Sequence, residues 1–363
     1  KRGTIMIVSN RRAASMLAAV SVGLSALPAL AAHGANFAVT NLVSDGFVPA
    51  ATVDPSLINP WGMSYAPTGP FWVSDNNGGV ATLYNGAGAK IGLTVNIPPP
   101  AGKTGSGTAT GQVFNGEPHG FRVTSGGKTD GAVFLFATED GTISGWAPSV
   151  DGVNAILAID NSAEGAVYKG LAIAHRKGAN FLYAANFFAG DVEMYDGKFH
   201  LVKVFTDPTV PAGYAPFNVQ NLDGTLYVTF ALQDADKHDD VRGPGHGFVD
   251  AFSLDGTFQR RLVSHGRLNS PWGLDIAPAG FGPFGGDLLV GNFGNGLINA
   301  FDPRTGVFKG DLRHAQGGPV ELGDLWGLIN GNGGSAGDIN TVYFTAGVRN
   351  EAHGLFGSLS PIP

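Results

Sequence analysis

The segment Asn59-Pro60-Trp61-Gly62-Met63 decides the fold, because its pattern recurs along the chain. In each copy a bulky or aromatic residue precedes a glycine, and apolar residues follow. The other copies are at residues 117–121, 168–171, 216–219, 271–274 and 325–328. Aligned on the glycine, which is Asn218 in the fourth copy, successive copies lie 58, 50, 48, 55 and 54 residues apart. Six copies at nearly even spacing indicate a repeat architecture.

A second strand-like run follows each copy and ends in small polar residues. These runs are at residues 72–76, 135–139, 182–186, 227–230, 289–292 and 342–345. They are rich in β-branched and aromatic residues, a composition typical of strands. The tripeptide Asp-Gly-Thr begins at Asp140, Asp223 and Asp255, and its glycine suits the positive φ of a tight hairpin turn.

Four short antiparallel strands in each of six units predict an all-β fold, a six-bladed β-propeller, with residues 33–363 as one domain. A pair of β-sandwiches is the alternative, but it does not explain one pattern that recurs six times. The strand expected at residues 37–43 precedes the first copy and has no blade of its own. We expect it to close the ring as the outer strand of the last blade.

Composition excludes several classes of protein. The chain has 56 Gly and 22 Pro among 363 residues, which argues against a helical bundle or coiled coil. It is 43% hydrophobic and 14% charged, which argues against disorder. There is no cysteine, so disulfides, iron–sulfur centres and thiolate zinc sites are excluded. Zincin, Walker A and dinucleotide-binding motifs are also absent from the sequence.

Residues 1–32 have the pattern of a signal peptide: four basic residues, no acidic residue, an apolar run and a small-x-small ending. They predict a periplasmic or secreted protein with no membrane anchor after cleavage. The pair Arg11-Arg12 leaves both Sec and twin-arginine export open. The net charge of −7 becomes −11 without these residues, which argues against nucleic acid and suits cations or neutral ligands.

The segments 60–63, 271–274 and 325–328 resemble first strands of the six-bladed propellers that include NHL-repeat proteins and gluconolactonase-like hydrolases. More closely, the chain resembles a family of exported bacterial propeller proteins, through the loop at 233–240 and the segments 243–248 and 351–356. The closer resemblance covers residues 37–360. It implies a fold and a location, and it implies no activity.

Sequence position also predicts where a site lies. In a propeller, the connection into the first strand and the connection from the second to the third strand share one face, around the mouth of the central channel. Loops at such a face commonly carry binding residues. The candidate ligand-binding residues there are Asn59, Asn76, Asn186, Asn218, Asn292 and Arg349.

Two Glu-x-His pairs are candidate metal ligands or acid–base groups, Glu117 with His119 and Glu351 with His353. The alternative is that they hydrogen-bond the backbone of neighbouring loops. The acidic loop that starts at Asp234 has oxygen ligands that suit a calcium ion, with His246 as a further candidate ligand. It does not match the EF-hand pattern. A solvated loop is the alternative there.

Trp61, Trp272 and Trp326 occupy one repeat position, which favours packing in the core over ligand stacking. Two functions follow from these patterns. The first is a monomeric scaffold that binds a small molecule or a protein at the channel mouth. The second is a metal-assisted hydrolase or lactonase that uses a divalent cation, calcium, zinc or manganese, held by the Glu and His residues.

Overall fold

The computed structural model describes residue 3 and residues 36–362. The chain divides into two units, residues 1–33 and 34–363, and only the second is described here. The predicted signal peptide at residues 1–32 lies outside the described residues, apart from Gly3, and stays a prediction. Within the described part of the chain, no helix is long and apolar enough to cross a membrane.

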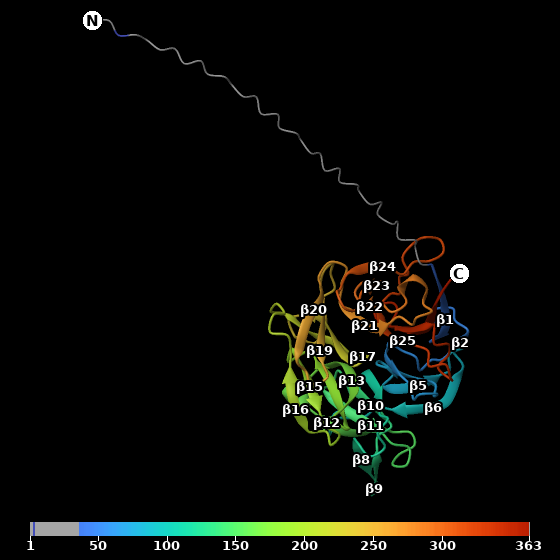
Figure 1. The fold of residues 1–363 in the computed structure, drawn as a ribbon. Helices are drawn as coiled ribbons and strands as arrows, with labels where there is room; N and C mark the ends of the chain where they lie inside the picture. Colours follow the sequence, from blue (N-terminus) through green and yellow to red (C-terminus); the bar gives the residue numbers. More distant parts are fainter. Residues whose placement is uncertain (1–2, 4–35, 363) are drawn as a thin grey trace. The chain divides into compact units, whose positions relative to one another are not determined.

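Residues 37–361 form a six-bladed β-propeller, as predicted (Figure 1). Each blade is an antiparallel sheet whose strands follow one another from the channel outward. Blade one is β3 (Pro60–Ser64), β4 (Phe71–Asp75), β5 (Val80–Tyr84) and β6 (Lys90–Asn96). Blade two is β7 (Ala109–Phe114), β10 (Phe134–Thr138), β11 (Thr142–Trp146) and β12 (Ile156–Asp160). Blade three is β13 (Tyr168–Arg176), β14 (Ala179–Asn186), β15 (Asp191–Tyr195) and β16 (Leu201–Phe205).

The second half of the ring repeats this order. Blade four is β17 (Tyr214–Leu222), β18 (Thr225–Leu232), β19 (Phe248–Ser253) and β20 (Phe258–Ser264). Blade five is β21 (Pro271–Ile276), β22 (Leu288–Asn292), β23 (Ile298–Phe301) and β24 (Phe308–Asp311). Blade six is β25 (Leu325–Asn330), β26 (Val342–Ala346), β27 (Leu355–Pro361) and β1 (Phe37–Ser44), with the short β2 (Thr52–Val53) at its edge.

The N-terminal strand closes the ring, as the sequence predicted. β1 pairs antiparallel with β27, from Phe37 opposite Pro361 to Ser44 opposite Leu355. The last blade is therefore built from both ends of the propeller, which joins the first and last parts of the described chain through backbone hydrogen bonds.

The predicted first strand of blade two is wrong. The inner strand is β7, and the segment 117–121 follows it, before a hairpin of β8 (Arg122–Ser125) and β9 (Lys128–Gly131). The true repeat glycine is Gly111, which Thr110 precedes instead of an aromatic residue. The inserted hairpin and the missing aromatic residue together moved the alignment to the next segment with a bulky residue before glycine.

Close approach of neighbouring inner strands explains the repeated glycine. A Cβ on Gly62 would lie 2.6 Å from the Thr110 carbonyl oxygen, and one on Gly327 would lie 2.7 Å from that of Trp61. Gly111 meets the next inner strand in the same way, with the Leu171 nitrogen 2.2 Å away. Only a residue without a side chain fits at these contacts, because real Cβ atoms do not come so close to backbone atoms.

Three tryptophans fill the channel. The rings of Trp61 and Trp326 stack with centroids 3.4 Å apart, and Trp272 meets them edge-on at 6.0 and 5.7 Å. All three are buried, together with Phe217 and Phe293. The prediction that they belong to the core is confirmed. We call this group the tryptophan plug.

Candidate site at the mouth of the channel

A buried lysine stands at one end of the channel. Lys169 lies on β13 directly before the repeat glycine Gly170, and only 2% of its side chain is exposed. Its ammonium forms ion pairs with Glu139, which follows β10, and with Asp239 Oδ1 at 3.1 Å. The same Nζ lies 5.3 Å from the centre of the Trp61 ring. Lys169 therefore sits on the tryptophan plug, at the end where inner strands begin, which we call the mouth.

Lys169 keeps its charge despite its burial. Burial acts to lower the pKa of Lys169, but the carboxylates of Glu139 and Asp239 act against it, and the net shift of this pKa is upward. A buried ammonium with two carboxylate partners is thus a fixed positive centre at the mouth.

Amides from blade one hold two carboxylates around this centre. Asn76 Nδ2 donates to Glu139 Oε2 at 2.7 Å, and Asn59 Nδ2 donates to Glu351 Oε2 at 2.9 Å. Trp326 Nε1 donates to Asn59 Oδ1 at 3.0 Å, which fixes the orientation of the Asn59 amide. The structure therefore brings together three residues that the sequence analysis proposed for the mouth or for metal: Asn59, Asn76 and Glu351.

Glu351 is a titratable group near neutral pH. Burial and the charge of Glu139 act to raise the pKa of Glu351, the hydrogen bond from Asn59 acts to lower it, and the net result is a pKa of about 7. Arg242 reaches the same carboxylate from the opposite side, with Nη2 3.8 Å from Glu351 Oε1, and pairs with Asp324 Oδ1 at 2.7 Å. Near neutral pH the protonated form of Glu351 can donate a hydrogen bond, and the ionised form only accepts.

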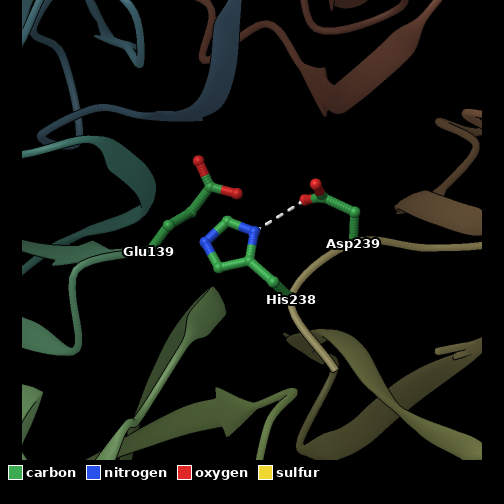
Figure 2. Close-up of side chains that lie close together, drawn as sticks. All are labelled: Glu139, His238 and Asp239. Atoms are coloured by element: carbon green, nitrogen blue, oxygen red, sulfur yellow. Dashed lines mark hydrogen bonds and ion pairs between the residues drawn. The ribbon is translucent and has the colours of Figure 1, made fainter. Parts of the chain in front are cut away.

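Three side chains at the mouth could hold a metal ion (Figure 2). Ligand atoms of Glu139, His238 and Asp239 all lie within 4.8 Å of one another. His238 Nδ1 lies 2.9 Å from Asp239 Oδ1, and this bond raises the pKa of His238 and lowers that of Asp239. A histidine with two carboxylates suits zinc or manganese. Both carboxylates already pair with the ammonium of Lys169, however, so a metal ion would compete with it.

The structure does not bring Glu117 and His119 to the mouth. They follow the end of β7, and β7 begins beside the end of β10, where Ala109 faces Thr138. Glu117 therefore lies beyond the end of the inner strand that is farther from Glu139. Its Oε2 accepts a hydrogen bond from the Asn180 backbone at 3.1 Å, and His119 is exposed. The expectation that these residues join Glu351 is wrong, because blade two was misaligned by one segment.

The other predicted metal ligands lie apart from one another. His353 Nδ1 is 2.7 Å from Asp45 Oδ2, and its ring stacks on Phe47, so it does not act with Glu351. His246 Nδ1 bonds the Val241 carbonyl oxygen at 2.8 Å. Asp234 Oδ1 accepts from the His238 backbone at 2.9 Å and so shapes the acidic loop. Of the two Glu-x-His pairs, only Glu117 bonds a neighbouring backbone as the alternative expected, whereas Glu351 and His353 bond side chains.

The remaining predicted ligand-binding residues make contacts within the blades or beside the mouth. Asn186 Nδ2 donates to Glu193 Oε1 at 2.7 Å, and Asn218 Nδ2 donates to the Trp272 carbonyl oxygen at 2.8 Å. Asn292 Nδ2 donates to Asn299 Oδ1 at 2.8 Å. The guanidinium of Arg349 lies over Phe47, 5.3 Å from its ring centre. The Asn186 and Asn292 amides thus join strands within a blade, and the Asn218 amide joins the inner strands of blades four and five.

Lys169 is the mouth residue that the sequence analysis missed, whereas Glu139, at the end of a second strand, and His238, Asp239 and Arg242, in the acidic loop, were expected at the mouth without an assigned role. One signal was available for Lys169: it is the only charged residue directly before the glycine of a repeat copy. His238 and Asp239 belong to the acidic loop that the sequence analysis considered for calcium, but their pairing with blades two and three depends on the closed ring.

Comparisons with known proteins identify relatives of this chain. No family model matches the chain. "Uncharacterized protein R648" of Acanthamoeba polyphaga mimivirus is 34% identical over 332 residues, 88% of this chain and 79% of that protein. "Uncharacterized protein L690" of the same virus is 34% identical over 337 residues, 90% of this chain and 86% of that protein.

Among solved structures, virginiamycin B lyase from Staphylococcus aureus aligns with a TM-score of 0.49 and 13% identity, over 90% of this chain and all of that one. No statement about activity follows from a likeness at this level. The expected restriction to bacteria needs correction, because the relatives reported above are viral. The chain belongs to the family of propeller proteins that includes these two mimivirus proteins.

Proposed function

We propose that the protein is a binding propeller that holds a small polar ligand at the mouth, above the tryptophan plug. The observation that carries this proposal is the network around Lys169, to which several blades contribute. Blade two supplies Glu139, the loop after β18 supplies Asp239, and the loop after β26 supplies Glu351. Burying charges costs free energy, and groups with shifted pKa values concentrate at functional sites.

The pairing of charges indicates the kind of ligand. Lys169 is neutralised by Glu139 and Asp239, and Arg242 by Asp324. The group left to meet a ligand is Glu351, because the Asn59 and Asn76 amides already hold carboxylates, and its pKa of about 7 lets it donate or accept. Hydroxyl groups also donate and accept, so a neutral hydroxyl-bearing ligand such as a sugar or polyol fits best.

Calorimetric titration with a panel of neutral sugars and polyols tests this proposal. We expect saturable binding to the unmodified protein, at least a tenfold loss in Glu351→Leu, and no change in Glu117→Gln, which alters a carboxylate far from the mouth. Binding that survives Glu351→Leu, or a panel in which no compound binds, would contradict the proposal.

A metal-assisted hydrolase is the second candidate, and the observation that favours it is the cluster of Glu139, His238 and Asp239. A divalent ion held there would polarise a carbonyl group or activate water. Hydrolysis of lactones and esters, assayed with added zinc, manganese or calcium, tests this function. Activity that depends on the metal and disappears in His238→Ala would favour the hydrolase over the binding propeller.

A further inference from the structure

A cavity lies at the opposite end of the channel from Lys169. Its volume is about 560 Å³, within the usual range for small-molecule sites. Its polar wall comes from the ends of three neighbouring inner strands, with Asn221 on β17, Asp275 on β21 and Asn330 on β25. Its apolar wall includes Leu222 and Ala277.

Three buried oxygens in this wall have no hydrogen-bond partner among the described residues. They are Asn221 Oδ1, Asp275 Oδ2 and Asn330 Oδ1. The two amide nitrogens are already used, because Asn221 Nδ2 donates to the Ile173 carbonyl oxygen at 3.0 Å and Asn330 Nδ2 to that of Ile276 at 2.9 Å. These bonds fix which end of each amide is the oxygen. A buried acceptor without a donor is costly, and three on residues that line one cavity require an explanation.

The charge at this end is also unbalanced. Asp275 is only 6% exposed and has no lysine or arginine within ion-pair distance in the described part of the chain. Burial and the charge of Asp223 together raise the pKa of Asp275 to about 8, although hydrogen bonds from the backbone of Ile276 and Asn330 act to lower it. A cation brought by a ligand would offset both effects and favour the carboxylate form.

We infer that this cavity binds a small primary ammonium compound. An –NH₃⁺ group has three donors and one positive charge, which suits a wall with a carboxyl group that lacks a cation and two amide oxygens that lack donors. The rest of the ligand lies against the apolar wall. This site is separate from the proposed sugar or polyol site, because the tryptophan plug fills the channel between the two ends.

Calorimetric titration with n-butylammonium chloride tests the inference, with n-butanol as the neutral probe of the same shape. We expect saturable binding of butylammonium and none of butanol. Asp275→Asn keeps the shape of the side chain and removes its charge, so it should weaken butylammonium binding at least tenfold. Glu117→Gln, the matched carboxylate control, should leave binding unchanged.

Three outcomes would overturn the inference: no saturable binding of butylammonium, equal binding in Asp275→Asn, or equal binding of butanol. A second titration uses calcium chloride. Binding of calcium but not of butylammonium would assign the oxygens to a metal ion instead. A crystal structure of the unmodified protein with bound butylammonium tests the inference without any substitution. The butylammonium nitrogen should lie within hydrogen-bond distance of Asp275, and an amine bound elsewhere would overturn the inference.

Discussion

The two ends of the channel differ in how their charges are paired. At the mouth, Lys169 and Arg242 each meet a carboxylate of the opposite sign. At the other end, Asp275 has no cation beside it in the described part of the chain, and two amide oxygens near it accept no hydrogen bond. One ring of inner strands thus has an end whose two cations are both paired with carboxylates, and an end that lacks a cation.

This difference follows from which segments form each end. Asp239 and Arg242 belong to the loop between β18 and β19, and this loop reaches over the mouth to pair with Lys169 of blade three and Asp324 before blade six. Asp275 and Asn330 lie on inner strands, where the backbone ladder fixes their positions. A loop can adjust to pair charges across the ring, whereas a strand residue has only its neighbours.

Removing the buried cation at the mouth should have the largest effect. Lys169→Met leaves Glu139 without its partner, and breaking such a buried pair costs about 3 kcal/mol of unfolding free energy. Urea unfolding measures this change. The double variant Lys169→Met/Glu139→Gln should recover most of the loss, and a surface control, Lys309→Met, should change stability by less than about 0.5 kcal/mol. A stable Lys169→Met single variant would show that the mouth does not depend on this pairing.

The stability of the ring of inner strands should be sensitive to added side-chain volume. Gly327→Ala places a Cβ 2.7 Å from the Trp61 carbonyl oxygen, and overpacking of this kind costs about 2 kcal/mol. Gly92→Ala on the outer strand β6 meets nothing within 4 Å and serves as the control. Thermal unfolding of both variants gives the comparison. Equal melting temperatures would argue against close contact between inner strands.

The unpaired carboxyl should make stability depend on pH. The folded pKa of Asp275, about 8, lies above its ordinary value, so the folded state holds the proton more tightly. The contribution of the Asp275 carboxyl group to the unfolding free energy is therefore largest at about pH 4 and below, and it is lost as the pH rises toward 8. Asp275→Asn should remove this slope and be more stable than the unmodified protein by about 2 kcal/mol at pH 8.

Glu351 offers the comparison at the mouth. Its folded pKa of about 7 gives a slope of the same sign, but the group is partly exposed and Asn59 donates to it, so the slope should be smaller. Urea unfolding at several pH values checks both residues. A steeper dependence for Glu351 than for Asp275 would reverse the comparison.

The smallest effect is expected for Glu117→Gln. This carboxylate accepts one backbone hydrogen bond, from Asn180, and an amide oxygen can accept the same bond. We expect a change of less than about 0.5 kcal/mol in unfolding free energy and unchanged ligand binding at both ends. A clear loss of mouth binding would restore the original hypothesis that Glu117 belongs to the site.

The fold was predictable because the ring imposes a physical requirement at regular intervals. Gly62, Gly273 and Gly327 lie where neighbouring inner strands touch, and their spacing is visible in the sequence, although Asn218 takes this place in blade four. The same rule failed in blade two, because Gly111 follows Thr110 instead of an aromatic residue and the inserted hairpin β8–β9 lengthens the blade. Strand geometry, not the aromatic residue, is the constant feature.

The candidate site was predictable only in part. Asn59, Asn76 and Glu351 follow from their positions at strand ends, since the order of strands fixes which ends share a face. Lys169 was missed because its partners come from other blades, and only the closed ring brings them within reach. The free oxygen of Asn330 depends on where its amide nitrogen bonds, and no pattern of residue types reveals that.

The central claim is that Lys169 is the resident cation of the mouth, and metal content tests it most directly. Mass spectrometry on protein purified without chelator should find less than about 0.1 divalent ion per chain, because the ammonium already holds the oxygens of Glu139 and Asp239. Metal should bind only after Lys169→Met frees both carboxylates beside His238. One metal ion per chain in the unmodified protein, lost in His238→Ala, would contradict the claim and favour the hydrolase.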